Sequence, residues 1–263
     1  MPGRENYPQD SRGPQDAPRV TNIRDIMAAA FRSTPQDRIG SQDPADEARL
    51  LTTVYTELGL FNPAFAEQVP EILKPRIADL RAAHPGTELQ PLVAVRLVPD
   101  FGLRALLANF NKRQTEETFV WPGLWPRYES DLPMLNRRSL DGNNDPADLA
   151  VVGMPLAADN TYGEAGLTLT DRTLEQQRRA IGRGMLANVV DWTVLAALGR
   201  ERGERPIDSR TFTRFPQMQE YPVDGVDGVG AARSLGSQAA LGGSGGGRYG
   251  SVGVRRLVGR DKS

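Results

Sequence analysis

The chain has 263 residues and a formal net charge of −1, and 39% of its residues are hydrophobic. It contains no cysteine and one histidine, His84. These counts exclude disulfides, thiolate metal sites and metal sites built from two histidines. No apolar run reaches the roughly 18 residues of a membrane span, and the polar N-terminus lacks a signal-peptide segment. We therefore expect no membrane partner and a location in the cytoplasm or in a virion.

Residues 1–43 are predicted to form a flexible arm that contains one short amphipathic helix. The arm is polar and carries as many basic as acidic side chains. Within residues 20–33 the apolar side chains recur at helical spacing. They are Val20, Ile23, Ile26, Met27, Ala30 and Phe31. Because an isolated amphipathic helix usually docks on the protein's own core or on a neighbouring subunit, we expect Ile23, Ile26, Met27 and Phe31 to form an interface.

Residues 44–220 are predicted to be the core domain, and their periodicity is mostly helical. Helices are expected over 43–58, 62–84 and 103–110, and a long one from Asp171 to Gly199. His84 is expected at a helix C-terminus, where imidazole suits the negative end of the helix dipole. Residues 92–98 fit either a short strand or a helix, and residues 209–217 alternate like an edge strand or an extended arm.

The region from residue 114 to 168 interrupts this periodicity and is rich in Pro, Gly and aromatic residues. Its Trp121, Trp125 and Tyr128 are interpreted as interface anchors or internal packing, in preference to base stacking. Carboxylates such as Asp159 and Glu164 also lie here. Since such pairs can act as acid and base, the region is the candidate location of a carboxylate and arginine site.

Residues 221–263 are glycine-rich and are predicted to be a flexible basic tail, with a net charge of +5 over residues 229–263. Gly245, Gly247 and Gly250 match the spacing G-x-G-x-x-G of dinucleotide-binding loops. That motif requires a following helix and an acidic residue about 20 positions on, and too few residues follow Gly250 to provide them. A phosphate loop is therefore rejected, and we expect no cofactor and no metal.

Two groups of arginines are candidates for contacting nucleic acid or a protein partner. Arg172, Arg179 and Arg183 would share one face of the long helix, although a solvated, salt-bridged face is the favoured interpretation of them. Arg248, Arg255, Arg256 and Arg260 lie in the predicted tail, and basic tails commonly meet nucleic acid such as RNA.

Together these features predict a mainly α fold: a single helical domain with a long irregular insertion, flanked by disordered N- and C-terminal arms. The layout resembles that of viral coat, nucleocapsid and virion-assembly proteins, and many regulatory adaptors share it. We therefore expect a non-enzymatic structural protein that forms homo-oligomers. The alternatives are a hydrolase or transferase with its site in residues 114–168, and a DNA-binding regulator that uses the arginine helix.

Overall fold

A computed structural model describes residues 43–95, 102–114, 116–135, 149–181, 185–223, 225–235 and 238–259. The chain divides into two units, Met1–Ile39 and Gly40–Ser263, and the described residues belong to the second. The predicted arm helix, with its interface residues Ile23, Ile26, Met27 and Phe31, lies outside the described residues.

The first elements follow the predicted periodicity, except that the helix expected over 62–84 is divided between a 3-10 turn and a shorter helix. They are α2 (Pro44–Glu57), the 3-10 turn η2 (Pro63–Phe65) and α3 (Val69–Ala83). The Asp43 carboxylate caps α2 by accepting a hydrogen bond from the Ala45 amide at 2.8 Å. His84 is the C-cap residue of α3, as expected, and its Nε2 lies 2.9 Å from the Gly259 carbonyl oxygen.

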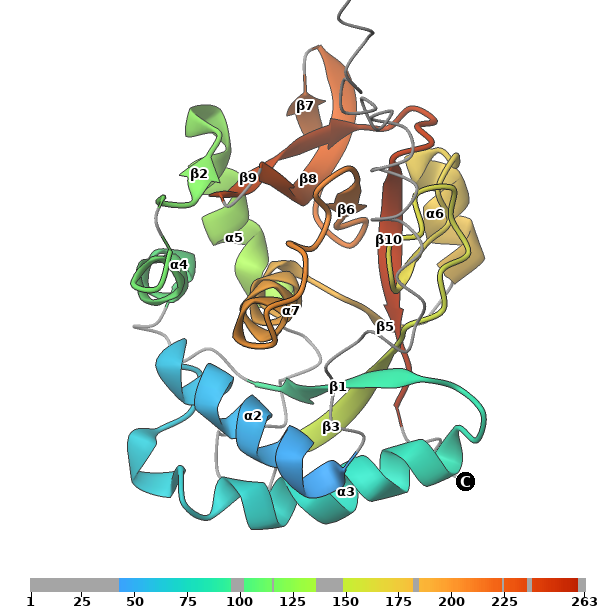
Figure 1. The fold of residues 1–263 in the computed structure, drawn as a ribbon. Helices are drawn as coiled ribbons and strands as arrows, with labels where there is room; N and C mark the ends of the chain where they lie inside the picture. The colour runs from blue at the N-terminus through green and yellow to red at the C-terminus, as the bar shows by residue number, and fades with distance from the viewer. Residues whose placement is uncertain are drawn as a thin grey trace, which may run out of the picture. The chain divides into compact units, whose positions relative to one another are not determined.

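A two-stranded antiparallel ladder lies beside α2 and α3 (Figure 1). It consists of β1 (Leu89–Ala94) and β3 (Ala150–Pro155), in register from Leu89 opposite Pro155 to Ala94 opposite Ala150. The Tyr55 hydroxyl of α2 donates to the Val93 carbonyl at 3.0 Å and accepts from the Val93 amide at 2.8 Å. The choice between strand and helix that the sequence left open is therefore settled as strand over residues 92–94.

Three further helices are α4 (Leu103–Asn111), α5 (Trp125–Leu135) and α7 (Val189–Glu201). α7 is almost entirely buried, and Trp192 at its centre has no exposed surface. It packs against α2 and α4 (Figure 1). This agrees with the expectation that the apolar segment from Met185 to Leu198 is central to the core.

The long helix predicted from Asp171 to Gly199 is wrong. The chain instead forms α6 (Leu174–Ile181), the short strand β5 (Met185–Leu186) and then α7. Asn188 begins α7 with a capping box, in which its side chain accepts from the Val190 and Asp191 amides and the Asp191 carboxylate accepts from the Asn188 amide. Glycine between the two halves weakens a continuous helix, and this cap specifies a new start.

The described strands other than β1 and β3 form an eight-stranded mixed sheet in the order β2-β9-β8-β6-β10-β4, with β5 paired to β10 and β7 to β8. The remaining strands are β2 (Phe119–Val120), β4 (Leu167–Thr168), β6 (Phe212–Arg214), β7 (Tyr221–Val223), β8 (Val226–Leu235), β9 (Gln238–Gly245) and β10 (Val252–Leu257). β6 lies between β8 and β10, so the expectation of an edge strand or arm at 209–217 is wrong.

The mainly α prediction is therefore corrected to an α/β fold, and the predicted disordered C-terminal arm is instead the strands β8, β9 and β10. Its glycines were interpreted as linker residues, but several allow close packing. A Cβ on Gly228 would overlap the Ser244 carbonyl oxygen, and one on Gly230 would overlap the Met218 sulfur. Composition alone does not distinguish a glycine that confers flexibility from one that permits a close approach.

In the part of the chain that the structure describes, none of the helices has the length and apolar character needed to cross a bilayer.

Candidate functional site

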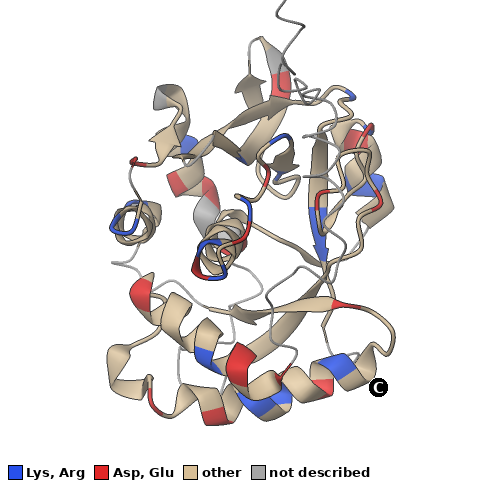
Figure 2. Cartoon of the chain, in the orientation of Figure 1, with Lys and Arg blue, Asp and Glu red and all other residues tan. Residues whose placement is uncertain are grey.

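A groove of about 460 Å³ lies over β2, β8 and β9. Its lining residues are Phe119, Trp121, Gly123, Leu124, Phe212, Pro222, Val223, Arg233, Leu235, Ala240, Leu241, Gly242 and Gly243. β2, β8 and β9 are mostly uncharged in Figure 2, where both signs of charge are scattered over the helices. The groove is thus a concave, mainly apolar surface.

Large apolar side chains stand exposed around this groove. Trp121 is 59% exposed, Leu235 44% and Phe119 41%. The Phe119 and Trp121 rings meet edge to face, with centroids 6.0 Å apart and planes at 85°. Single exposed apolar residues are common, but three that surround one apolar groove are typical of a binding surface.

The backbone around β2 explains why Trp121 points outward. β2 runs parallel to β9, with Phe119 opposite Ala240, and the Trp121 amide donates to the Leu241 carbonyl at 3.0 Å. Pro122 then opens the 3-10 turn η3 (Pro122–Leu124). Since a residue before proline favours an extended backbone, Trp121 continues the strand direction by one residue.

Tyr128 and Trp125, which the sequence grouped with Trp121, have internal roles. Tyr128 is fully buried, and its hydroxyl lies 3.0 Å from the Ala231 carbonyl oxygen and 2.8 Å from that of Gly242. Burial raises the pKa of Tyr128 well above its usual value. Trp125 is partly buried, with the Arg104 guanidinium 4.2 Å from its ring centroid. Of the three predicted anchors, Trp121 is the one available to a partner.

Arg233 is the one ionisable residue in the described lining of the groove. Its guanidinium carbon stands 4.5 Å from the centroid of the Phe212 ring. Its Nε is buried and has no hydrogen-bond partner in the described part of the chain. Arg233 pairs with Ala240 across the β8–β9 ladder, and Leu235 lies two residues on, so these side chains share one face of the sheet.

Arg255, predicted to bind nucleic acid or a partner, is instead fully buried. Its Nη2 donates to Asp208 Oδ1 at 2.7 Å, and its Nε donates to Thr213 Oγ1 at 2.9 Å. Asp208 also accepts from Trp192 Nε1 at 2.8 Å and from Thr211 Oγ1 at 2.8 Å. This closed network uses the cation inside the fold, so Arg255 is removed from the surface arginines.

Glu164, named among the candidate catalytic carboxylates, lies at the edge of this network. Its Oε1 is 3.1 Å from the Asp208 amide nitrogen, which donates to it, and 3.5 Å from Arg255 Nη2. Burial and the Asp208 charge raise the pKa of Glu164, and Arg255 opposes them. Asp159, its predicted companion, accepts instead from Thr168 Oγ1 at 2.8 Å. The Glu164 carboxylate therefore accepts a hydrogen bond from the Asp208 backbone amide, and the predicted pairing of Glu164 with Asp159 is not formed.

The glycine motif at 245–250 lies against a second buried arginine. Arg214 Nη2 donates to the Gly245 carbonyl at 2.7 Å and to the Gly247 carbonyl at 3.2 Å. Its Nη1 donates to Gln177 Oε1 at 2.9 Å. Burial lowers the pKa of Arg214 to about 10. These carbonyls face an internal cation, an arrangement with no resemblance to backbone amides that cradle a phosphate.

The remaining predicted arginines do not form one described surface. Arg172 precedes α6 and Arg179 lies within it, and both are exposed, with Arg179 paired to Glu175. Arg248 and Arg256 are also exposed, and Arg256 Nη2 donates to the Ala180 carbonyl at 3.1 Å. Arg183 and Arg260 lie outside the described residues. Contact of the exposed arginines with nucleic acid stays a prediction.

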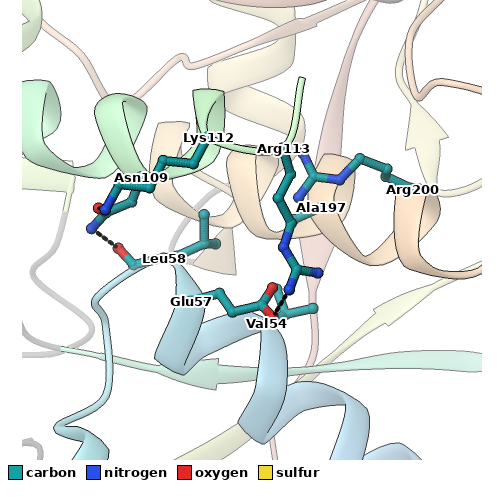
Figure 3. A pocket seen from close by; sticks show the side chains of 8 residues that line it. All are labelled: Val54, Glu57, Leu58, Asn109, Lys112, Arg113, Ala197 and Arg200. Carbon is teal, nitrogen blue, oxygen red and sulfur yellow. Dashed lines mark hydrogen bonds and ion pairs between the residues drawn. The ribbon is translucent and has the colours of Figure 1, made fainter. Parts of the chain in front are cut away.

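A second, smaller cavity of about 130 Å³ lies where α2, α4 and α7 end. Figure 3 shows its lining residues, Val54, Glu57, Leu58, Asn109, Lys112, Arg113, Ala197 and Arg200. Arg113 bridges Glu57 and Glu201. Each helix C-terminus carries about half a negative charge, so the three cations balance three helix ends and two carboxylates. No positive charge is left over for an anionic ligand.

Sequence reasoning missed Phe119, Phe212, Arg233 and Leu235 as lining residues of the groove. The alternation of Arg233 and Leu235 along β8 was hidden because the β8–β9 ladder has the composition of a linker. Within the described residues, no group of three His, Asp or Glu side chains has the arrangement of a metal site. Comparison with family models, curated proteins and solved structures finds no match to this chain.

Proposed function

We propose that the chain is a self-associating assembly protein, and that the groove over β2, β8 and β9 is the surface through which one copy binds another. The observation that carries this proposal is the exposed rim of the groove, formed by Phe119, Trp121 and Leu235. Tryptophan is enriched among the few residues that dominate binding energy at interfaces.

The chemistry of the lining favours binding over catalysis. Acid–base chemistry needs a titratable group in reach of the substrate, and the described lining offers Arg233 alone. Glu164, the described carboxyl with a raised pKa, belongs to the Arg255–Asp208 network and does not line the groove. The groove suits apolar side chains that leave water on binding.

The charge of the chain supports a second copy as the occupant. A formal net charge of −1 leaves little electrostatic repulsion between copies. The resemblance to viral assembly proteins rested partly on a disordered C-terminal tail. Those residues instead form β8, β9 and β10, so the resemblance does not support the proposal. The support comes from the groove and its exposed rim.

The mass of the full chain in solution, measured by analytical ultracentrifugation over a wide concentration range, tests the proposal. We expect the mass to rise with concentration. Trp121→Ser and Leu235→Asp should each weaken association about 30-fold, which corresponds to about 2 kcal/mol at an interface hot spot. Phe65→Ser is the matched control, since Phe65 is an exposed aromatic outside the groove. A wild-type chain that is monomeric throughout, or three variants that behave alike, would contradict the proposal.

A further inference from the structure

We infer that the occupant of the groove is the segment 20–33 of the neighbouring copy, and that Arg233 binds a carboxylate of the same arm. This inference rests on the proposed self-association and names the part of the partner that carries it. Three features support it: the apolar lining of the groove, the Arg233 Nε that has no hydrogen-bond partner in the described part of the chain, and the apolar stripe in the sequence of the arm.

The segment 20–33 has the pattern that an apolar groove binds. Its apolar side chains follow helical spacing in an arm that is otherwise polar, so as a helix it would present one apolar stripe. A stripe at i, i+3, i+4 and i+7 inserted into a groove is a recurring mode of peptide recognition. The nine residues from 34 to 42 can span up to about 30 Å between this segment and the start of α2.

Arg233 gives the groove a requirement beyond apolar contact. Its side chain is partly buried, stacks on Phe212 and leaves Nε without a hydrogen-bond partner in the described part of the chain. Sealing the groove with apolar side chains alone would take the guanidinium further out of water without compensation. A carboxylate from the occupant would neutralise the charge and accept from the guanidinium with good geometry.

The arm offers carboxylates at the two ends of its apolar stripe. Asp16 stands before Pro18 and Asp37 after Pro35, so each lies just outside the predicted helix 20–33, beside one end of its apolar stripe. Asp25 lies within the segment but falls on the opposite side of the predicted helix. Asp16 and Asp37 are therefore the candidate partners of Arg233, the orientation of the helix decides between them, and Asp25 is a built-in control.

Docking of an arm into a neighbour's groove is a heterologous contact, in which the two surfaces differ. The two surfaces can therefore be disabled separately, each in its own full-length variant. The groove variant, Leu235→Asp, keeps a working arm. The arm variant, Ile26→Asp with Met27→Asp, keeps a working groove. We expect each variant alone to stay monomeric at concentrations where the wild type associates, and an equimolar mixture to form a one-to-one heterodimer.

The carboxylate is tested by double-mutant cycles in the full chain. Arg233→Gln should weaken association about tenfold and reduce its salt dependence. Either Asp16→Asn or Asp37→Asn should weaken the wild type similarly but have no further effect beside Arg233→Gln. Asp25→Asn should leave association unchanged in both backgrounds. Circular-dichroism melting of every variant, expected to match the wild type, separates loss of binding from loss of folding.

The outcomes distinguish this inference from the proposed function. A wild-type chain that never associates overturns both. An arm variant that associates as strongly as the wild type overturns the inference alone, because the contact is then groove against groove. Normal association of Arg233→Gln, or additive effects of Arg233→Gln with both Asp16→Asn and Asp37→Asn, overturns the role of Arg233.

Discussion

The helices α2 and α3 and the ladder of β8 and β9 obtain their order by different means. The helices bury apolar stripes in which residues such as Leu51 and Leu73 have no exposed surface. The ladder contains few large side chains, and its strands approach closely through glycines, with Arg214 and Arg255 buried beside it. The order of the helices comes from apolar side chains at helical spacing. The order of the ladder comes from glycines that permit close approach and from buried polar groups that pair with one another.

The largest loss of stability is expected from the buried ion pair that supports the sheet. Arg255→Met would leave the Asp208 carboxylate buried without its cation, which should lower the free energy of unfolding by about 3–5 kcal/mol. Urea unfolding measures it. The neighbouring Arg256→Met is the control, because Arg256 is exposed and should change stability by about 0.5 kcal/mol or less. Equal losses in the two variants would show that the network does not stabilise the sheet.

A comparable loss is expected in the helical region from a purely apolar truncation. Leu73→Ala in α3 removes a fully buried side chain and should destabilise the protein by about 2–5 kcal/mol, depending on how far the cavity closes. Leu50→Ala in α2, where the side chain is partly buried, should cost less. A Leu73→Ala variant that unfolds at the wild-type urea concentration would mean that α3 lies outside the cooperative core.

Two glycines of the β8–β9 ladder provide a matched test of close packing. Gly228→Ala would place a Cβ against the Ser244 carbonyl oxygen, so it should cost about 1–3 kcal/mol. Gly242→Ala meets nothing within 4 Å and should be close to neutral. Thermal melting of the two variants side by side measures the difference. If both were neutral, the ladder would have the freedom of the linker that its composition suggests.

The smallest effect is a pH dependence that comes from Glu164. Burial beside Asp208 raises its pKa in the folded state, so the folded chain holds this proton more tightly than the unfolded chain does. The contribution of Glu164 to the free energy of unfolding is fully present below the pKa of the unfolded chain, near 4.5. It is lost as the pH rises through the pKa of the folded chain.

Glu164→Gln should remove that loss, so the variant gains stability relative to the wild type as the pH rises from 4 towards neutrality. Urea unfolding across this range measures the gain, and Glu175→Gln, an exposed residue of α6, is the control. A difference from the wild type that is the same at every pH would show that Glu164 does not titrate in this way.

The comparison also explains how much could be predicted. The starts of α2 and η2, at Asp43-Pro44 and Asn62-Pro63, and the end of α3 at His84 are local signals, and they are confirmed. The strands β8 and β9 depend on partners far along the chain and on glycines whose neighbours are visible in three dimensions alone. The same separation explains why Arg255 was assigned to the surface: its partner, Asp208, is 47 residues away.

Of the residues that line the groove, the sequence singled out Trp121 alone. Trp121 stood out as an aromatic residue in an irregular segment, and it is exposed. Arg233 and Leu235 lie on a strand that was interpreted as tail, so no local signal joined them to Trp121. A surface made by two distant segments becomes recognisable once the pairing of β2 with β9 and of β9 with β8 is known.

The position of β10 has a consequence for how the chain acquires its fold during synthesis. β10 is inserted between β6 and β4, and just beyond it Val258 exchanges two hydrogen bonds of 2.7 Å with Gly153. The sheet therefore cannot close, and the ladder of β1 and β3 cannot be joined to it, until the chain has been translated to about residue 258. Until then the edges of β6 and β4 that pair with β10 lack their partner, so a ribosome that pauses before this point would hold an incomplete sheet open to proteases and chaperones.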